Sequence, residues 1–362
     1  MSEAGTGVGG WRCGRFAHTF ASIDLGTNNC RLLVARASAT GFDVLDSYSR
    51  PVRLGEGVAS QQVLCSGAIE RTMEALDACA NKIQKAGVTR SRHIATEACR
   101  RALNSADFLA RVQQRTGLAF QIISPREEAR LALASCESLI DRQSTHVLLV
   151  DIGGGSTEVV WVSVRPREAG ACGLDLSILD TISIPWGVVT LTEARLAGQS
   201  KCQPLAAGIY EQMVAQIKDA LAPFCRGNGV GGRVAAGGVQ MIGASGTVTT
   251  MAAYGMGLKR YHRATVDGTS IDRDTILRIG GHLARMSVEE LSGLPCIGWE
   301  RAELALAGGA ILEAVCRQWP VQRVVVADRG LREGVLVDLM READRECDPL
   351  TRRVEETTPF TV

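Results

Sequence analysis

The feature that most constrains the fold of this chain is an internal repeat of a strand, a glycine turn and a second strand. The two copies are Ile23-Asp-Leu-Gly-Thr-Asn-Asn-Cys-Arg-Leu-Leu-Val34 and Val150-Asp-Ile-Gly-Gly-Gly-Ser-Thr-Glu-Val-Val-Trp161. Their alignment superimposes Asp24 on Asp151, which is 127 positions later, because 151 − 24 = 127. Since this spacing is one domain length, the sequence predicts two duplicated α/β domains, each opening with a hairpin. Hairpins that face each other would place two glycine turns across one interdomain cleft.

Composition agrees with two globular domains in a chain of 362 residues. Hydrophobic residues make up 46% and charged residues 22%, which excludes a disordered or fibrous chain. The net charge is +1, so no global field attracts nucleic acid or a membrane surface, and we expect neither as a partner. The uncharged stretch 234–258 is interrupted by glycines and polar residues, which favours a buried strand, loop and helix over a membrane span. The 12 cysteines form no zinc-type cluster, and we expect reduced thiols in a cytoplasmic protein.

Between the two hairpins, helical periodicity predicts a helix over Gly67–Ala86. A further helix is expected to begin at Ser124, which can cap it, with Pro125 in the first turn. Glu127 and Glu128 follow in that turn, where carboxylates complement the helix dipole. Helix capping alone is therefore one interpretation of this pair of glutamates.

The two glycine turns suit phosphate chemistry. A turn rich in Gly, Ser, Thr and Asn exposes successive backbone N–H groups, and such concavities bind anions. A single turn of this kind can merely connect two strands, but two copies, each led by an aspartate, favour a ligand site. The aspartates suit Mg²⁺, which binds few carboxylates and keeps part of its water shell. A third segment, 242–248, precedes an expected helix near 249–253 and is either a phosphate site or a packed glycine loop.

Seven segments resemble the exopolyphosphatase/guanosine-pentaphosphate phosphatase (Ppx/GppA) family of the actin–Hsp70–sugar-kinase superfamily. In chain order they span residues 22–31, 94–104, 123–131, 150–158, 185–193, 242–247 and 327–334. The resemblance covers about residues 20–340 and implies two ribonuclease-H-like (actin-like ATPase) domains around an interdomain cleft. Departures from the family's pattern are Thr27 and Asn29 in the first loop, Pro125 before the glutamate pair, and Glu303.

The expected organisation follows from this resemblance to the short, two-domain members of the family. Residues 1–17 are expected to be a tail. Domain I is expected over 18–135, joined by about 331–345, and domain II over 136–330. A second tail is expected over 346–362.

The resemblance also implies roles for individual residues. Glu128 matches the position of the base that activates water, with Glu127 as the fallback and Glu158 as a residue that helps to align the water. Mg²⁺ or Mn²⁺ would be held by Asp151 and Glu158, with Asp24 close to the metal or the phosphate. The residues expected to bind phosphate are Asp24, Gly26, Thr27, Asn28, Asn29, Arg31, Arg100, Gly153, Gly154, Gly155, Ser156, Thr157, Gly246, Thr247 and Arg301.

The function implied is an exopolyphosphatase, which hydrolyses the terminal phosphate of inorganic polyphosphate with divalent metal. Its close alternative is a guanosine pentaphosphate 5′-phosphohydrolase that produces guanosine tetraphosphate. A non-catalytic regulator that binds alarmones or nucleotides is a different class, and Glu128, Asp151 and Glu158 argue against it. A kinase or chaperone that uses ATP is a third class, which the glutamate pair disfavours. The family further implies a homodimer.

Overall fold

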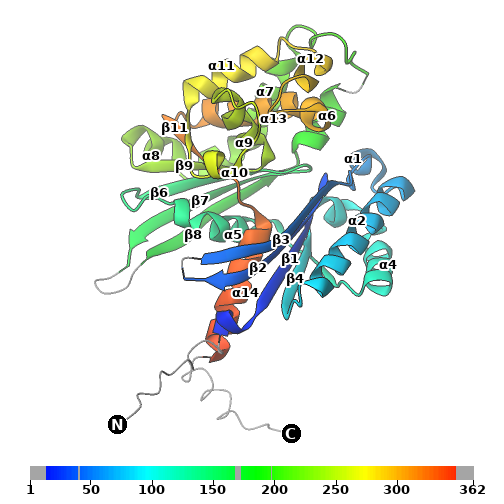
Figure 1. Cartoon of the computed structure of the whole chain (residues 1–362). Helices are drawn as coiled ribbons and strands as arrows, with labels where there is room; N and C mark the ends of the chain where they lie inside the picture. Colours follow the sequence, from blue (N-terminus) through cyan, green and yellow to red (C-terminus); the bar gives the residue numbers. More distant parts are fainter. Residues whose placement is uncertain (1–13, 40, 168–172, 197, 348–362) are drawn as a thin grey trace, which may run out of the picture.

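The computed structural model describes residues 14–39, 41–167, 173–196 and 198–347. They form two α/β domains, each built on one sheet (Figure 1). The first sheet has the order β3-β2-β1-β4-β5, and its strands are β1 (Thr19–Leu25), β2 (Asn29–Ser38), β3 (Gly41–Pro51), β4 (Arg90–Ala95) and β5 (Phe120–Ile122). The second has the order β10-β11-β9-β6-β7-β8, with β6 (His146–Ile152), β7 (Thr157–Pro166), β8 (Leu174–Ile184), β9 (Val239–Ala244), β10 (Ser270–Asp272) and β11 (Arg323–Ala327).

The topology of the two sheets confirms the predicted duplication. In each, the first three strands form an antiparallel meander, and two later strands add in parallel beside the first one. The register repeats as well, because Asp24 pairs with Arg31 across the first hairpin and Asp151 pairs with Glu158 across the second. Only β10, antiparallel to β11, has no counterpart in the first sheet as the structure describes it.

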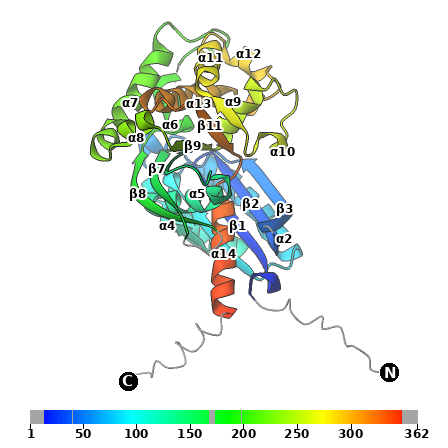
Figure 2. The same ribbon diagram turned by 90° about the vertical axis from the view of Figure 1, so that its left-hand side faces the viewer.

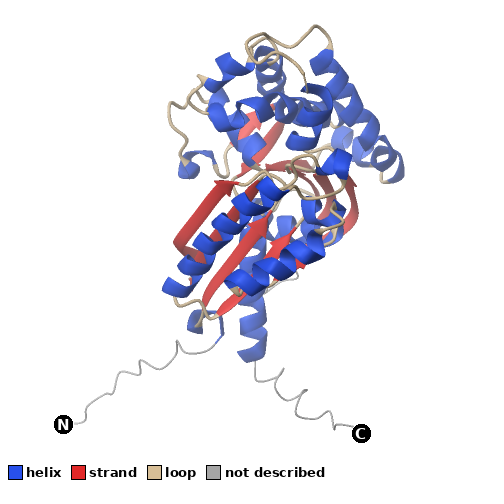
Figure 3. Ribbon diagram, turned by 90° about the vertical axis from the view of Figure 1, so that its right-hand side faces the viewer, coloured by secondary structure: helices blue, strands red, loops and turns tan. Residues whose placement is uncertain are grey.

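Helices cover the faces of both sheets (Figure 3). Those placed between the strands of the first sheet, or directly after it, are α1 (Val58–Gln61), α2 (Ser66–Lys85), α3 (Glu97–Arg101), α4 (Ser105–Thr116), α5 (Pro125–Cys136) and the 3-10 helix η2 (Glu137–Leu139). Those of the second are α6 (Val188–Leu196), α7 (Ile209–Gly227), α8 (Val230–Ala236), α9 (Gly246–Gly255), α10 (Arg263–Val266), α11 (Arg273–Leu283), α12 (Val288–Ser292) and α13 (Trp299–Gln318). The predicted helix over Gly67–Ala86 is confirmed as α2, and the uncharged stretch forms β9 and α9 within the core. Within the described residues, no helix has the length and apolar character needed to cross a membrane.

The last helix, α14 (Leu331–Cys347), connects the two halves of the molecule. It follows β11 of the second sheet and runs beside α5 and β1 (Figure 2). One apolar cluster joins α14 and α5 to both sheets, and Leu336, Phe20 and Leu149 are among its buried members. A Cβ atom at Gly334 would lie 2.1 Å from the Leu131 carbonyl oxygen, so α14 and α5 cross this closely only because position 334 is glycine. Since α5 opens at the cleft, this contact fixes its direction.

The ends of the described chain differ from the expected tails. Gly14–Ala17 form a 3-10 helix, η1, whose Arg15 donates hydrogen bonds from N and Nε to the Asp344 carboxylate, at 2.9 and 2.6 Å. At the other end, α14 continues to Cys347, so residues 346 and 347 belong to the helix. The remaining parts of both expected tails, residues 1–13 and 348–362, lie outside the described residues. Among the described residues, nine cysteines are free thiols, whereas Cys347 is in a disulfide, which departs from the expectation of reduced thiols.

Candidate active site

A cavity of about 260 Å³ lies where the two domains meet. Four segments that are distant in sequence contribute to its wall: the first glycine turn, the second glycine turn, the start of α9 and the link from β11 to α14. The predicted site residues that line it are Asp24, Gly26, Thr27, Asn28, Asn29, Arg31, Glu128, Asp151, Gly153, Gly154, Gly155, Ser156, Gly246, Thr247 and Arg301. The duplication therefore brings its two hairpins together at one site.

The two glycine turns share their internal geometry and touch each other. The Gly26 N–H donates to the Asn29 carbonyl at 3.0 Å, and the Gly153 N–H donates to the Ser156 carbonyl at 2.9 Å. A Cβ atom at Gly155 would lie 2.6 Å from Thr27 Oγ1 in the opposite turn. Side chains at this position of the second turn would therefore push the domains apart, and glycine permits the close approach.

The third glycine segment meets the same cavity. α9 begins at Gly246, three residues before the expected start, because the Ser245 side chain accepts a hydrogen bond from the Thr247 N–H at 3.2 Å and caps the helix. Arg301, from α13, also lines the cavity and donates to Thr250 Oγ1 at 3.1 Å. Arg31 lies opposite, with its Nη2 3.9 Å from the position that a Cβ atom at Gly246 would take. Two guanidinium groups therefore face the space between the turns.

The side chains of Glu127 and Glu128, at the start of α5, lie in different environments. The predicted cap is confirmed, since Ser124 Oγ accepts a hydrogen bond from the Glu127 N–H at 3.2 Å. The Glu127 carboxylate lies outside the cavity wall and forms ion pairs with Arg92 and Arg130, at 3.1 and 2.8 Å. Glu128 is buried at the cavity wall. Of the pair, only Glu128 is placed to reach a substrate in the cavity.

Arg100 stands behind Glu128 and is absent from the cavity wall as the structure describes it. Its Nη1 donates to Glu128 Oε2 at 2.6 Å and to the Ile123 carbonyl at 2.9 Å. Its Nε donates to Glu97 Oε2 at 3.0 Å. The guanidinium group already pairs with two carboxylates, although its buried Nη2 has no hydrogen-bond partner in the described structure, so the phosphate contact expected for Arg100 stays a prediction.

Two further predicted residues, Thr157 and Glu158, do not line the described cavity. Thr157 is fully buried and donates from Oγ1 to the Trp186 carbonyl at 2.7 Å, so its hydroxyl does not face a ligand. Glu158 is also buried, and its Oε1 accepts hydrogen bonds from Ser156 Oγ at 2.7 Å and Ser183 Oγ at 2.8 Å. It follows that Glu158 acts on the cavity through its charge and through Ser156.

Burial and mutual repulsion raise the pKa values of the carboxyl groups around the cavity. Burial, followed by the charges of Glu158 and Asp24, raises the pKa of Asp151 to about 7. Burial is also the main cause of the raised pKa of Asp24 and of Glu158. For Glu128, burial and the neighbouring Glu158 raise the pKa well above its usual range, and Arg100 opposes them. The four acidic side chains of the described wall outnumber its three arginines, so their ionised forms leave an excess of negative charge that burial disfavours.

This excess of negative charge fits a divalent cation. Asp24 Oδ1 is buried and has no hydrogen-bond partner in the described structure, which is costly unless a cation or water meets it. No three Asp, Glu, His or Cys side chains of the described residues form a ready-made metal site. Such a sparse set suits Mg²⁺, which is bound through one or two carboxylates together with substrate phosphates and water. Asp24 and Asp151, which line the cavity, are the residues that fit this role.

Comparison with known proteins identifies the family. A model of the Ppx/GppA phosphatase family matches residues 33–343, which is most of the chain. The chain belongs to this family. An exopolyphosphatase-like protein of known structure is 28% identical, with a TM-score of 0.79, over 90% of this chain and 98% of that chain. The Aquifex aeolicus Ppx/GppA family member is 26% identical, with a TM-score of 0.71, over 94% of this chain and 99% of that chain.

A more distant protein of known structure shares the fold. An exopolyphosphatase from Cytophaga hutchinsonii is 20% identical, with a TM-score of 0.76, over 90% of this chain and 98% of that chain. The two predicted actin-like domains are thus confirmed as the fold of this Ppx/GppA protein.

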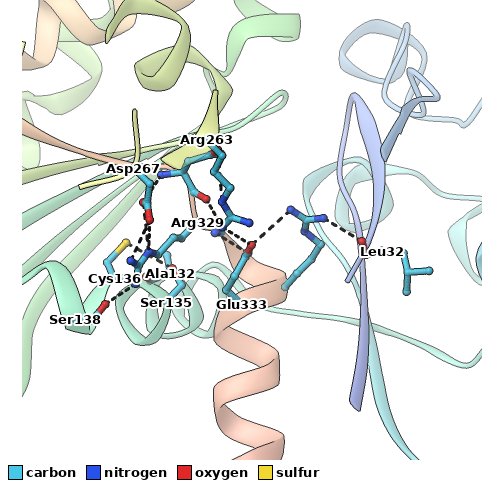
Figure 4. Close-up of polar contacts among 12 residues, drawn as sticks. Leu32, Ala132, Ser135, Cys136, Ser138, Arg263, Asp267, Arg329 and Glu333 are labelled. Carbon is cyan, nitrogen blue, oxygen red and sulfur yellow. Dashed lines mark hydrogen bonds and ion pairs between the residues drawn. The ribbon is translucent and has the colours of Figure 1, made fainter. Parts of the chain in front are cut away.

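Sequence reasoning missed two charged residues of the cavity wall, Glu97 and Arg329. Figure 4 shows Arg329 beside Asp267, to whose Oδ2 its Nε donates at 3.0 Å, and beside Ser138. Arg332 donates to the Leu32 carbonyl of β2 at 3.1 Å. Arg329 and Arg332 both belong to the segment 327–334, which resembles the Ppx/GppA family. Their position in that motif could have indicated a role at the site.

We expect the metal-free protein to become less stable as the pH rises from 5.5 to 7.5. The pKa of Asp151 is about 7 in the folded state, against an ordinary value of 3.8, so the folded state binds more protons in this window. Stability is then highest below the unfolded pKa and falls as the pH rises to the folded pKa, by about 4 kcal/mol in all, of which about 2 kcal/mol is lost above pH 5.5. Thermal unfolding in the presence of chelator measures this slope.

Asp151→Asn should make that slope shallower, whereas the surface variant Asp274→Asn should keep it, since the Asp274 side chain is 85% exposed. An Asp151→Asn protein with the wild-type slope would contradict the raised pKa.

Proposed function

We propose that this chain is an exopolyphosphatase that removes the terminal phosphate of inorganic polyphosphate by means of water activated by Glu128. The observation that carries the proposal is the position of Glu128, buried at the wall of a cavity that two glycine turns and two cavity-facing arginines also line. In its ionised form, which the neighbouring Arg100 favours, a carboxylate with a raised pKa is a stronger base than an ordinary glutamate. A regulator that only binds nucleotides has no need of such a group.

In the reaction, Glu128 accepts a proton from water as the water oxygen attacks the terminal phosphorus atom. The bond to the bridging oxygen breaks in line with the attack, and the shortened chain leaves with that oxygen. Arg31 and Arg301 stabilise the negative charge on the transferring phosphoryl group. Mg²⁺ bound near Asp24 and Asp151 would neutralise further charge on the phosphate oxygens.

Guanosine pentaphosphate is the second candidate substrate, and a specific observation favours it. Beyond the glycine turns, the cavity wall continues as an apolar surface of domain II formed by Val188, Met251, Tyr254, Leu283, Ile297 and Leu304. Inorganic polyphosphate gains nothing from such a surface, whereas a nucleobase could pack against it. The chemistry at Glu128 is the same for both substrates.

Phosphate release from the purified protein tests the proposal. Short polyphosphate, long polyphosphate, guanosine pentaphosphate and ATP are compared, each with and without Mg²⁺. Metal-dependent release from polyphosphate supports the exopolyphosphatase, and faster release from guanosine pentaphosphate supports the second candidate. Saturable binding of any of these compounds without phosphate release would instead indicate a regulator.

Arg31→Ala should raise the KM for polyphosphate by about 10- to 100-fold, because a charge-assisted hydrogen bond to phosphate is lost. Its KM should also depend less steeply on salt concentration. Arg36→Ala is the matched control, since Arg36 lies on the same strand, is exposed and donates to Thr19 Oγ1. Equal KM values for the two variants would place the phosphate site elsewhere.

A further inference from the structure

Glu97 is a charged residue of the cavity wall whose role the proposed reaction does not explain. It is the first residue of α3, and only 16% of its side chain is exposed. A carboxylate facing a polyanionic substrate repels it, so direct phosphate binding does not account for Glu97. One carboxylate, that of Glu128, would already neutralise Arg100. A second buried carboxylate at the same guanidinium adds a cost of desolvation that calls for a function.

The shortest contacts of Glu97 are with Arg100, whereas Arg101 Nη1 lies 4.0 Å from Glu97 Oε1. Glu97 Oε2 accepts a hydrogen bond from Arg100 Nε at 3.0 Å and lies 2.9 Å from Nη2. The two residues are three positions apart in α3, which places them on one face of the helix. Arg100 Nη1 then extends past Glu97 to Glu128 Oε2, at 2.6 Å. The guanidinium group is thus held on one side by Glu97 and presents its other side to the proposed base.

Glu97 also contacts the opposite domain. A Cβ atom at Gly155 would lie 2.9 Å from Glu97 Cγ and 3.2 Å from its Cβ, so the stem of Glu97 packs directly against the second glycine turn. This packing limits the positions that the Glu97 carboxylate can take. Glu97 therefore links the second glycine turn to Arg100, the arginine that contacts Glu128.

We propose that Glu97 is a positioning residue for the hydrolysis, which holds the Arg100 guanidinium so that Arg100 in turn fixes the carboxylate of Glu128 at the cavity wall. The inference rests on the proposed role of Glu128 as the base. Without Glu97, the Arg100 side chain loses the partner of its Nε and is free to rotate about its long stem. The Glu128 carboxylate then loses a fixed orientation toward the water, and misplaced catalytic groups lower the rate of the chemical step.

A double-mutant cycle in phosphate release tests this role. Glu97→Ala should lower kcat by about 10- to 100-fold with KM nearly unchanged, because it acts on the chemical step. Glu97→Gln keeps an oxygen that can accept from Arg100 Nε and should recover part of that loss. Combining Glu97→Ala with Arg100→Ala should be no slower than Arg100→Ala alone, within about twofold, since Glu97 acts through Arg100.

Glu211→Gln is the matched control. Glu211 also takes two hydrogen bonds from one arginine, Arg317, at 2.7 and 2.9 Å, and neither residue lines the described cavity. Its kcat should equal that of the wild type. Multiplicative losses in the double variant, an unchanged kcat in Glu97→Ala, or a change in KM alone would each overturn the inference.

A crystal structure of Glu97→Ala provides a readout that does not depend on turnover. The inference expects the Arg100 guanidinium to leave its present position and its contact with Glu128. An unmoved Arg100 would overturn it. If the wild-type protein releases no phosphate from any substrate, the proposed function fails, and the structure of the variant still decides whether Glu97 positions Arg100.

Discussion

Replacing Glu128 by glutamine is expected to lower the rate of polyphosphate hydrolysis by about 10²- to 10⁴-fold while substrate affinity stays close to the wild-type value. The glutamine has nearly the same size, and its oxygen can still accept the hydrogen bond that Arg100 Nη1 donates to Oε2. It cannot accept the proton of the attacking water. The loss should therefore appear in kcat, measured as phosphate release from saturating polyphosphate.

The fold should survive this substitution. Burial and the charge of Glu158 already disfavour the ionised form of Glu128, as its raised pKa indicates, so removing its charge relieves repulsion within the site. Arg100 keeps Glu97 as an ionic partner. A melting temperature within a few degrees of the wild type would verify that the loss of rate is a chemical effect.

Glu127→Gln is the control on the adjacent residue. Its carboxylate pairs with Arg92 and Arg130 outside the described cavity wall, and its side chain is 27% exposed. Partly exposed ion pairs of this kind contribute about 1 kcal/mol or less, so a small change in stability and mostly retained turnover are expected. The opposite pair of phenotypes would show that the base is Glu127. If neither variant were slow, the base would be a different group, and Glu158 would be examined next.

The sequence alone predicted the duplicated fold because each copy of the repeat is a short, continuous segment of the chain. Strand, turn and strand follow one another within a dozen residues, and the aspartates Asp24 and Asp151 mark equivalent positions in both copies. The cavity followed from the same argument, since two related hairpins that face each other must bring their turns together. The glycines expected to bind phosphate line this cavity, where the repeat places them.

Local sequence patterns left the choice between Glu127 and Glu128 open, and only the resemblance to the family favoured Glu128. Adjacent residues of a helix point about 100° apart, and which one meets the cavity depends on how α5 packs against α14 and both sheets. Glu127 finds Arg92, 35 positions away, and Glu128 finds Arg100, 28 positions away. Such distant partners are set by tertiary packing.

The orientation of single side chains was equally beyond sequence reasoning. Arg100 was assigned to phosphate because a guanidinium suits it, yet in the folded chain two carboxylates reach the group first. Glu158 was assigned to the metal, but two hydroxyl groups occupy its Oε1. In each case a partner from another segment, Glu128 or Ser183, contacts a group that the motif alone left free, and the expected role toward phosphate or metal stays a prediction.

Asp151→Asn is expected to lower phosphate release by at least about 10²-fold and to remove the response of the protein to Mg²⁺. Asparagine preserves the shape of the side chain and an acceptor oxygen, but it removes the charge that attracts the cation. Phosphate release measured over a Mg²⁺ titration should show no recovery at high metal concentration. Full activity of this variant in the presence of chelator would contradict the assignment.

Thermal unfolding separates the two acidic residues that the sequence assigned to the metal. A ligand that binds the folded state raises the melting temperature with its concentration, so Mg²⁺ should stabilise the wild-type protein above pH 7, where Asp151 is ionised. Asp151→Asn should lose this stabilisation. Glu158→Gln should keep it, because Glu158 accepts hydrogen bonds from Ser156 and Ser183 and is absent from the described cavity wall. Loss of the Mg²⁺ response in Glu158→Gln but not in Asp151→Asn would move the metal from the end of β6 to the start of β7.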